Sequence, residues 1–224
     1  MPRVQLSSLF LATCLAGPAS AATVTVHLTD QNNSGVGNAV VYALPLQANE
    51  EVAKQSCAGK CPPVSVMQKD LAFDPEVTAV QTGSKVSFLN LDRTKHQVYS
   101  LSSPKKFELP LYGGKQQTQE NAPSVEFDKS GEVVLGCNIH DKMKAYVFVV
   151  DTPYFVQGKG SDYMLKDLPA GKYVVRVWHP LALSKDALPS RRVDVAATAS
   201  EEWPISISLR KAPKSPPPNP SNYY

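Results

Sequence analysis

The stretch Gly136-Cys137-Asn138-Ile139-His140-Asp141-Lys142-Met143 separates two apolar runs of the chain. Residues 133–135 precede it and residues 145–150 follow it, and both runs are rich in β-branched or aromatic residues. Such runs on either side of a short polar break predict a strand, a loop and a second strand. Side chains of a continuous strand alternate between its faces, whereas on a tight loop the thiol, imidazole and thioether of this stretch can converge on one ion.

These three side chains have the spacing C-x2-H-x2-M. A thiolate, imidazoles and a weakly bound Met are the ligand set of an electron-transfer copper site. That set requires a second imidazole, and His96 is the candidate because it follows the strand-like run at residues 85–89. The residue types therefore predict a copper site formed by His96, Cys137, His140 and Met143.

The pattern Asn90-x-Asp92-x3-His96-x-Val98, followed by the run from Gly131 to Met143, resembles the plastocyanin/amicyanin class of cupredoxins. The short ligand loop is similar to that of amicyanin. The run from Cys137 to Phe155 resembles the cupredoxin-containing methylamine utilisation proteins of the MauL type. This resemblance covers roughly residues 64–155, and it implies a Greek-key β-sandwich with one type 1 copper ion that carries single electrons.

The resemblance also implies two supporting residues. In cupredoxins, a main-chain amide that follows the first His ligand bonds the thiolate sulfur and tunes the potential. Here that amide belongs to Gln97. The side chain of Asn90 is expected to tie the two ligand loops together.

Other kinds of site fit the same residues less well. A zinc site accepts Cys and two His, but a thioether is a poor zinc ligand. Attachment of a c-type haem requires C-x-x-C-H, and the second Cys is absent. Met143 alone would indicate core packing and His96 alone a loop histidine, but their order and spacing favour ligation. His27 and His179 have no partner in their own stretches, which favours structural roles.

The first 21 residues predict a secretory signal peptide. Arg3 supplies the positive charge, residues 9–15 the apolar core and residues 19–21 an A-x-A cleavage site. A lipid anchor at Cys14 is the less favoured alternative. We therefore expect a periplasmic protein without a membrane span.

Removal of the signal peptide leaves three cysteines, Cys57, Cys61 and Cys137. An odd number in an exported protein needs an explanation. Cys57 and Cys61 are close enough in sequence to form a disulfide. Metal ligation would then protect Cys137 as a thiolate. The alternative pairing of Cys137 with either of the others leaves another thiol unpaired.

The flanks of the copper region predict further strands. Residues 23–29 and 39–46 resemble the opening hairpin of a carboxypeptidase regulatory-like or transthyretin-like β-sandwich. Residues 162–177 resemble its second half, and residues 191–195 and 203–209 are expected to complete the sheet.

The expected fold is therefore all-β, with a Greek-key cupredoxin sandwich at residues 64–151. It is inserted into a discontinuous second sandwich, formed by residues 22–50 and 156–210. Two unrelated flanks are the alternative. Residues 211–224 are rich in proline and predict a disordered tail.

The formal net charge is only +3, and no dense basic run occurs, which argues against a nucleic-acid partner. Around the ligand loops, however, basic residues outnumber acidic ones. The basic residues of this rim are Arg93, Lys95, Lys142 and Lys144. A positive rim steers an acidic partner, so we expect a c-type cytochrome or a quinoprotein subunit to dock beside His140. Neither a catalytic base nor a nucleophile is apparent, so no enzyme is predicted. A copper carrier and a non-catalytic binding module are the alternatives.

Overall fold

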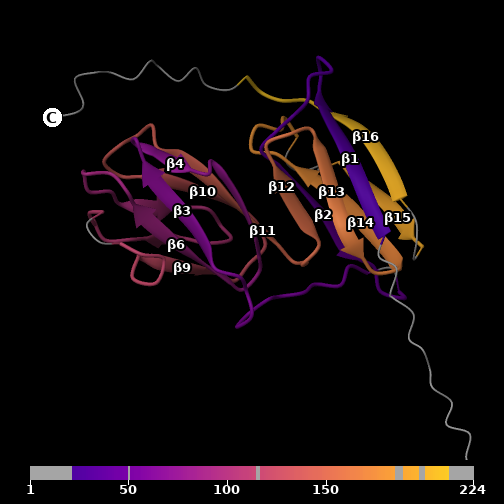
Figure 1. The fold of residues 1–224 in the computed structure, drawn as a ribbon, viewed down its shortest axis with the longest axis horizontal. Helices are drawn as coiled ribbons and strands as arrows, with labels where there is room; N and C mark the ends of the chain where they lie inside the picture. Colours follow the sequence, from indigo (N-terminus) through magenta and orange to yellow (C-terminus); the bar gives the residue numbers. More distant parts are fainter. Residues whose placement is uncertain (1–21, 50, 115–116, 185–188, 197–199, 212–224) are drawn as a thin grey trace, which may run out of the picture.

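The structure, a computed structural model, describes residues 22–49, 51–114, 117–184, 189–196 and 200–211 (Figure 1). Sixteen strands and no helix occur in these ranges, which confirms the all-β prediction. Accordingly, no helix in the described part of the chain is long and apolar enough to cross a lipid bilayer. The predicted signal peptide at residues 1–21 and nearly all of the predicted tail, residues 212–224, lie outside the described ranges.

Nine strands between residues 64 and 150 form the first β-sandwich. They are β3 (Val64–Lys69), β4 (Ala72–Asp74), β5 (Val77–Gln81), β6 (Ser84–Asn90), β7 (Val98–Ser100), β8 (Phe107–Glu108), β9 (Ser124–Phe127), β10 (Gly131–Cys137) and β11 (Lys144–Val150). One sheet has the order β5-β11-β10-β7-β8 and the other the order β4-β3-β6-β9. Alternate residues of β10, Val133, Leu135 and Cys137, are buried in the core between the two sheets.

Seven strands from the two ends of the described chain form the second sandwich. They are β1 (Ala22–Asp30), β2 (Ala39–Pro45), β12 (Phe155–Gly158), β13 (Asp162–Leu168), β14 (Gly171–Trp178), β15 (Ser190–Val195) and β16 (Ser200–Ile207). The sheets have the orders β13-β1-β16 and β12-β2-β14-β15. Both ends of the chain therefore contribute strands to both sheets. Division of the chain into separately folding domains stays a prediction.

The predicted opening hairpin is wrong. Strand β1 pairs with β13 and β16, whereas β2 pairs with β12 and β14 in the other sheet. Val26 of β1 and Val41 of β2 lie in one buried cluster, so the two strands face each other across the core. The turn after Asp30 therefore crosses between sheets, and the carboxylate of Asp30 accepts hydrogen bonds from the amides of Asn32 (2.8 Å) and Ser34 (2.9 Å) there.

The two sandwiches lie side by side and share a third buried cluster (Figure 1). Both faces of β11 are buried, because one faces the core that contains Val147 and the other faces the second sandwich. On that outer face, the ring of Phe148 stacks on Trp178 of β14 at a centroid distance of 4.4 Å. The side-chain amide of Gln157 on β12 donates to the carbonyl of Val77 and accepts from the amide of Ala79, so it covers the edge of β5.

The predicted disulfide between Cys57 and Cys61 is confirmed. Its loop lies against the turn between β5 and β6, where the Cys57 amide donates to the Thr82 carbonyl at 2.9 Å. Cys137 is a free, buried thiol, as the odd number of cysteines predicted.

Candidate metal centre

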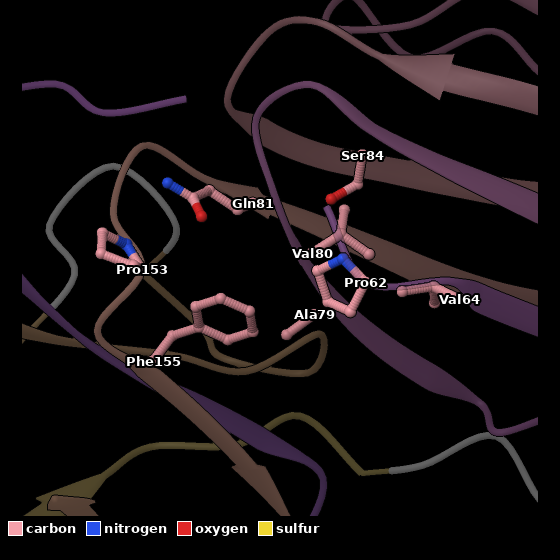
Figure 2. A pocket seen from close by; sticks show the side chains of 8 residues that line it. All are labelled: Pro62, Val64, Ala79, Val80, Gln81, Ser84, Pro153 and Phe155. Atoms are coloured by element: carbon pink, nitrogen blue, oxygen red, sulfur yellow. The ribbon is translucent and has the colours of Figure 1, made fainter. Parts of the chain in front are cut away.

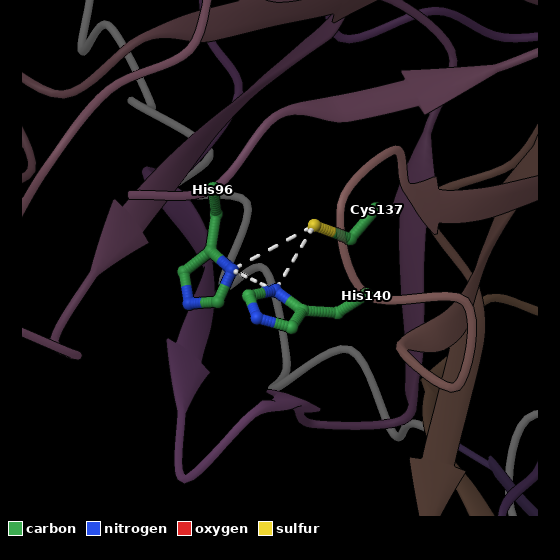
Figure 3. Close-up of side chains that lie close together, drawn as sticks. All are labelled: His96, Cys137 and His140. Carbon is green, nitrogen blue, oxygen red and sulfur yellow. Dashed lines mark hydrogen bonds between the residues drawn. The ribbon is translucent and has the colours of Figure 1, made fainter. Parts of the chain in front are cut away.

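His96, Cys137 and His140 bring their ligand atoms together at one end of the first sandwich (Figure 3). The Cys137 sulfur lies 3.6 Å from Nδ1 of His96 and 3.8 Å from Nδ1 of His140. The two Nδ1 atoms are 3.2 Å apart. One thiol and two imidazoles thus point to a common centre, which is the chemistry that the sequence predicted.

The strand arrangement explains why residues 41 positions apart meet. Cys137 is the last residue of β10 and pairs with Val98, the first residue of β7. His96 lies two residues before that pair, in the loop between β6 and β7. His140 lies on the turn between β10 and β11, which returns the chain to the same end of the sheet.

Burial differs among the three side chains. His96 is 0% exposed and Cys137 is 3% exposed, whereas His140 is partly exposed. Burial and the neighbouring His96 lower the pKa of His140, although Asp92 opposes this effect. A lowered pKa keeps this imidazole neutral near pH 7, and a neutral ring is the form that binds a metal.

Met143, the fourth predicted ligand, is buried in the core cluster that also contains Cys137. Its main-chain amide donates to the carbonyl of His140 at 2.9 Å, which closes the turn of the ligand loop. The structure therefore places Met143 beside the centre. Its ligation of a metal stays a prediction.

Asp92 orients His96. Its carboxylate lies 2.8 Å from Nε2 of His96, so Nε2 carries the proton and Nδ1 presents its lone pair to the centre. The same carboxylate accepts the amides of Asp70 (2.7 Å) and Leu71 (3.1 Å), which hold it in place. In the sequence, Asp92 is part of the pattern that leads to His96, without a predicted contact of its own. Its position four residues before His96 was the available signal.

Asn90 has a different role from the one expected. Its side-chain amide donates to the carbonyls of Thr94 (2.8 Å) and Tyr112 (3.1 Å), so it ties the His96 loop to the segment around Tyr112. The two ligand loops are instead joined by Gln97 and Asn138, through a main-chain bond of 3.1 Å and a side-chain bond of 2.9 Å. The bond expected from the Gln97 amide to the Cys137 sulfur stays a prediction.

Tyr112 and Gln68 are neighbours of the centre that sequence analysis missed. Nε2 of the fully buried Gln68 lies 2.5 Å from the Tyr112 hydroxyl. Burial raises the pKa of Tyr112 to about 12, with a smaller effect from Cys137 in the same direction and an opposing one from Gln68. Both residues are remote from the ligands in sequence, and no local pattern signals them.

The surface around the centre combines apolar and basic groups. Leu91, Leu111 and Ile139 are each 49% exposed and are sequence neighbours of Asp92, Tyr112 and His140. The four basic residues predicted for the docking rim are all exposed: Arg93, Lys95, Lys142 and Lys144.

A separate hollow of about 300 Å³ lies beside the start of β3 and the edge of β5 (Figure 2). Its walls are mainly apolar and include Pro62, Val80 and Phe155. None of the predicted ligands lines it, so it has no part in the metal centre.

The chain matches no protein-family model and no curated protein sequence. Among solved structures, the copper-containing nitrite reductase of Thermus scotoductus SA-01 matches with a TM-score of 0.36 and 24% identity over 48% of this chain and 25% of that one. A reduced amicyanin variant matches with a TM-score of 0.34 and 20% identity over 43% and 91% of the two chains. A purple cupredoxin from Nitrosopumilus maritimus matches with a TM-score of 0.33 and 16% identity over 38% of this chain and 98% of that one.

This chain therefore spans a quarter of the nitrite reductase. All three TM-scores lie below 0.5, so the function proposed below rests on the geometry of the centre and on the sequence.

A buried thiol and two imidazole Nδ1 atoms within 4.8 Å of one another suit copper in a trigonal arrangement. The buried thioether of Met143 suits copper better than it suits zinc. The residues present thus fit a copper ion.

Proposed function

We propose that this protein is an exported electron carrier with one type 1 copper ion, rather than an enzyme. The observation that carries the proposal is the convergence of His96, Cys137 and His140 at one end of a β-sandwich. A bound copper ion would supply the one-electron chemistry, and Met143 is proposed as its fourth ligand. Export to the periplasm follows from the signal peptide predicted at residues 1–21.

The surrounding residues hold the ligands in one geometry. Asp92 fixes the ring of His96, and the pairing of β10 with β7 and β11 fixes Cys137. A site that cannot rearrange changes little when an electron arrives or leaves. His140 is the most exposed of the three side chains, so we propose the outer edge of its ring as the route for electrons.

Copper titration of the purified chain tests this function. One equivalent of copper should produce an intense visible absorption from the thiolate and a narrow hyperfine splitting in electron spin resonance. A colourless protein that binds zinc in preference to copper would refute the proposal.

We also propose an acidic redox partner, such as a c-type cytochrome or a quinoprotein subunit. Ile139 beside the exposed edge of His140 offers an apolar contact, and the basic rim supplies long-range attraction. Such attraction accelerates encounter and weakens as salt is added.

Reversing Lys142 and Lys144 to Glu should slow electron transfer to this partner about tenfold at low salt, because steering by charge falls. The copper spectrum should remain nearly unchanged. Stopped-flow kinetics against ionic strength measures the effect. The matched control reverses Lys159 and Lys166, two exposed lysines of the second sandwich, for an equal change in net charge. Equal rates for both variants would place the docking surface elsewhere.

A further inference from the structure

Tyr112 holds the main chain of His96 through two hydrogen bonds. The His96 amide donates to the Tyr112 carbonyl at 2.9 Å, and the Tyr112 amide donates to the His96 carbonyl at 3.0 Å. This pair is an isolated bridge outside the named strands. The position of the His96 backbone therefore depends on the position of Tyr112.

The side chain of Tyr112 is itself anchored in the core. Its ring packs against the buried cluster that includes Cys137 and Met143. Its hydroxyl lies 2.5 Å from Nε2 of Gln68, which is on β3. The hydrogen bond thus links the sheet that contains β3 to the segment that pairs with His96.

Gln68 is an unusual residue for its position. It follows Val66 on the inward face of β3 and is 0% exposed. An apolar side chain would pack at this position without the cost of burying a polar group. Its Oε1 atom has no hydrogen-bond partner among the described residues. A buried amide with one unpartnered end lowers stability, so a stabilising role alone does not explain it.

We propose that Gln68 and Tyr112 form a positioning pair for His96, in which the glutamine fixes the tyrosine and the tyrosine fixes the ligand. The inference rests on the proposed copper site. The pair does not touch the metal. Instead, it keeps Nδ1 of His96 directed at the centre whether or not a metal is bound.

Tyr112→Phe tests the pair because it removes the hydroxyl and keeps the ring. In the metal-free protein, amide hydrogen exchange at His96 and Tyr112 should become about fivefold faster, as expected for the loss of one anchoring hydrogen bond. In the loaded protein, the copper dissociation constant should rise about tenfold, the lower end of the effect of residues that orient metal ligands. The thiolate-to-copper band should also shift.

Tyr173→Phe is the matched control. The Tyr173 hydroxyl donates to the Pro169 carbonyl at 2.8 Å within the second sandwich, far from His96 in the fold. Its loss should lower the melting temperature without changing copper affinity or hydrogen exchange at His96. A change in either property equal to that of Tyr112→Phe would show a global effect and overturn the proposal.

The double variant Gln68→Leu/Tyr112→Phe separates positioning from packing. Removal of both polar groups should restore thermal stability, but the fast exchange at His96 and the weak copper binding should persist. If thermal stability, slow exchange at His96 and tight copper binding all returned, the pair would serve packing alone and the inference would be overturned. If the wild-type chain binds no copper, the proposed function fails, and the exchange data alone still decide whether Tyr112 and Gln68 position His96.

Discussion

Replacement of Cys137 by Ala is expected to abolish the visible absorption of the copper-loaded protein completely. The colour of a type 1 site arises from the bond between the thiolate and copper, and Cys137 is the only free thiol among the described residues. His96 and His140 would remain and could still hold a metal ion, but without the charge-transfer band. The side chain is small and buried, so the fold should survive the substitution. Absorption and electron spin resonance after copper titration measure the outcome.

Removal of the other two cysteines provides the control for this variant. Cys57→Ala/Cys61→Ala opens a short disulfide loop and should cost about 2 kcal/mol of stability. This loop contributes no ligand, so the copper spectrum should stay at wild-type intensity. A coloured Cys137→Ala variant would show that another residue supplies the sulfur ligand, and the proposed centre would then be wrong.

The core of the candidate centre was predictable because its pattern is local. Cys137, His140 and Met143 lie within seven residues on one loop, and their chemical types restrict the possible metals. His96 was predicted as the second imidazole ligand because it follows a strand-like run. The disulfide followed from counting cysteines in an exported chain.

The residues that support the ligands were less predictable, because they depend on tertiary contacts. Gln68 and Tyr112 are 44 positions apart, and only the folded sandwich brings them together. Asn90 was expected to join the ligand loops, but the loops are joined by Gln97 and Asn138. Hydrogen-bond partners of this kind leave no periodic pattern in a sequence.

Strand positions were predicted better than strand partners. The alternation in residues 23–29 predicts a strand, which the structure shows as β1, but it does not say which strand lies beside it. For this reason β1 and β2 were assigned to one hairpin, although they lie in different sheets. The two-residue strand β8 is too short to show alternation, so the sequence does not predict it.

The contact between the two sandwiches has only an ambiguous signal in the sequence. A strand buried on both faces, such as β11, shows a continuous apolar run, which is also consistent with a central strand in a single domain. In the structure, the outer face of this run packs on Trp178 and Tyr42 of the second sandwich. The apolar run thus reflects the sandwich interface.

Trp178→Ala is expected to lower the free energy of unfolding by about 3–5 kcal/mol. The indole is 3% exposed, stacks on Phe148 at 4.4 Å and meets Tyr146 edge-on at 6.2 Å. Its Nε1 also donates to the Glu132 carboxylate at 3.3 Å. Because all these contacts cross between the sandwiches, their loss should uncouple the two units as well as destabilise them.

Thermal unfolding followed by two signals tests this expectation. The copper absorption reports the first sandwich, and circular dichroism reports both. In Trp178→Ala, we expect the two signals to separate into distinct transitions, while the copper spectrum at 25 °C stays normal because no ligand is touched. The control, Trp203→Ala, removes an indole that packs only in the second sandwich, so it should destabilise that unit and leave the copper transition near its wild-type temperature. Coincident transitions in Trp178→Ala, with a stability loss below about 1 kcal/mol, would mean that the aromatic contact does not hold the sandwiches together.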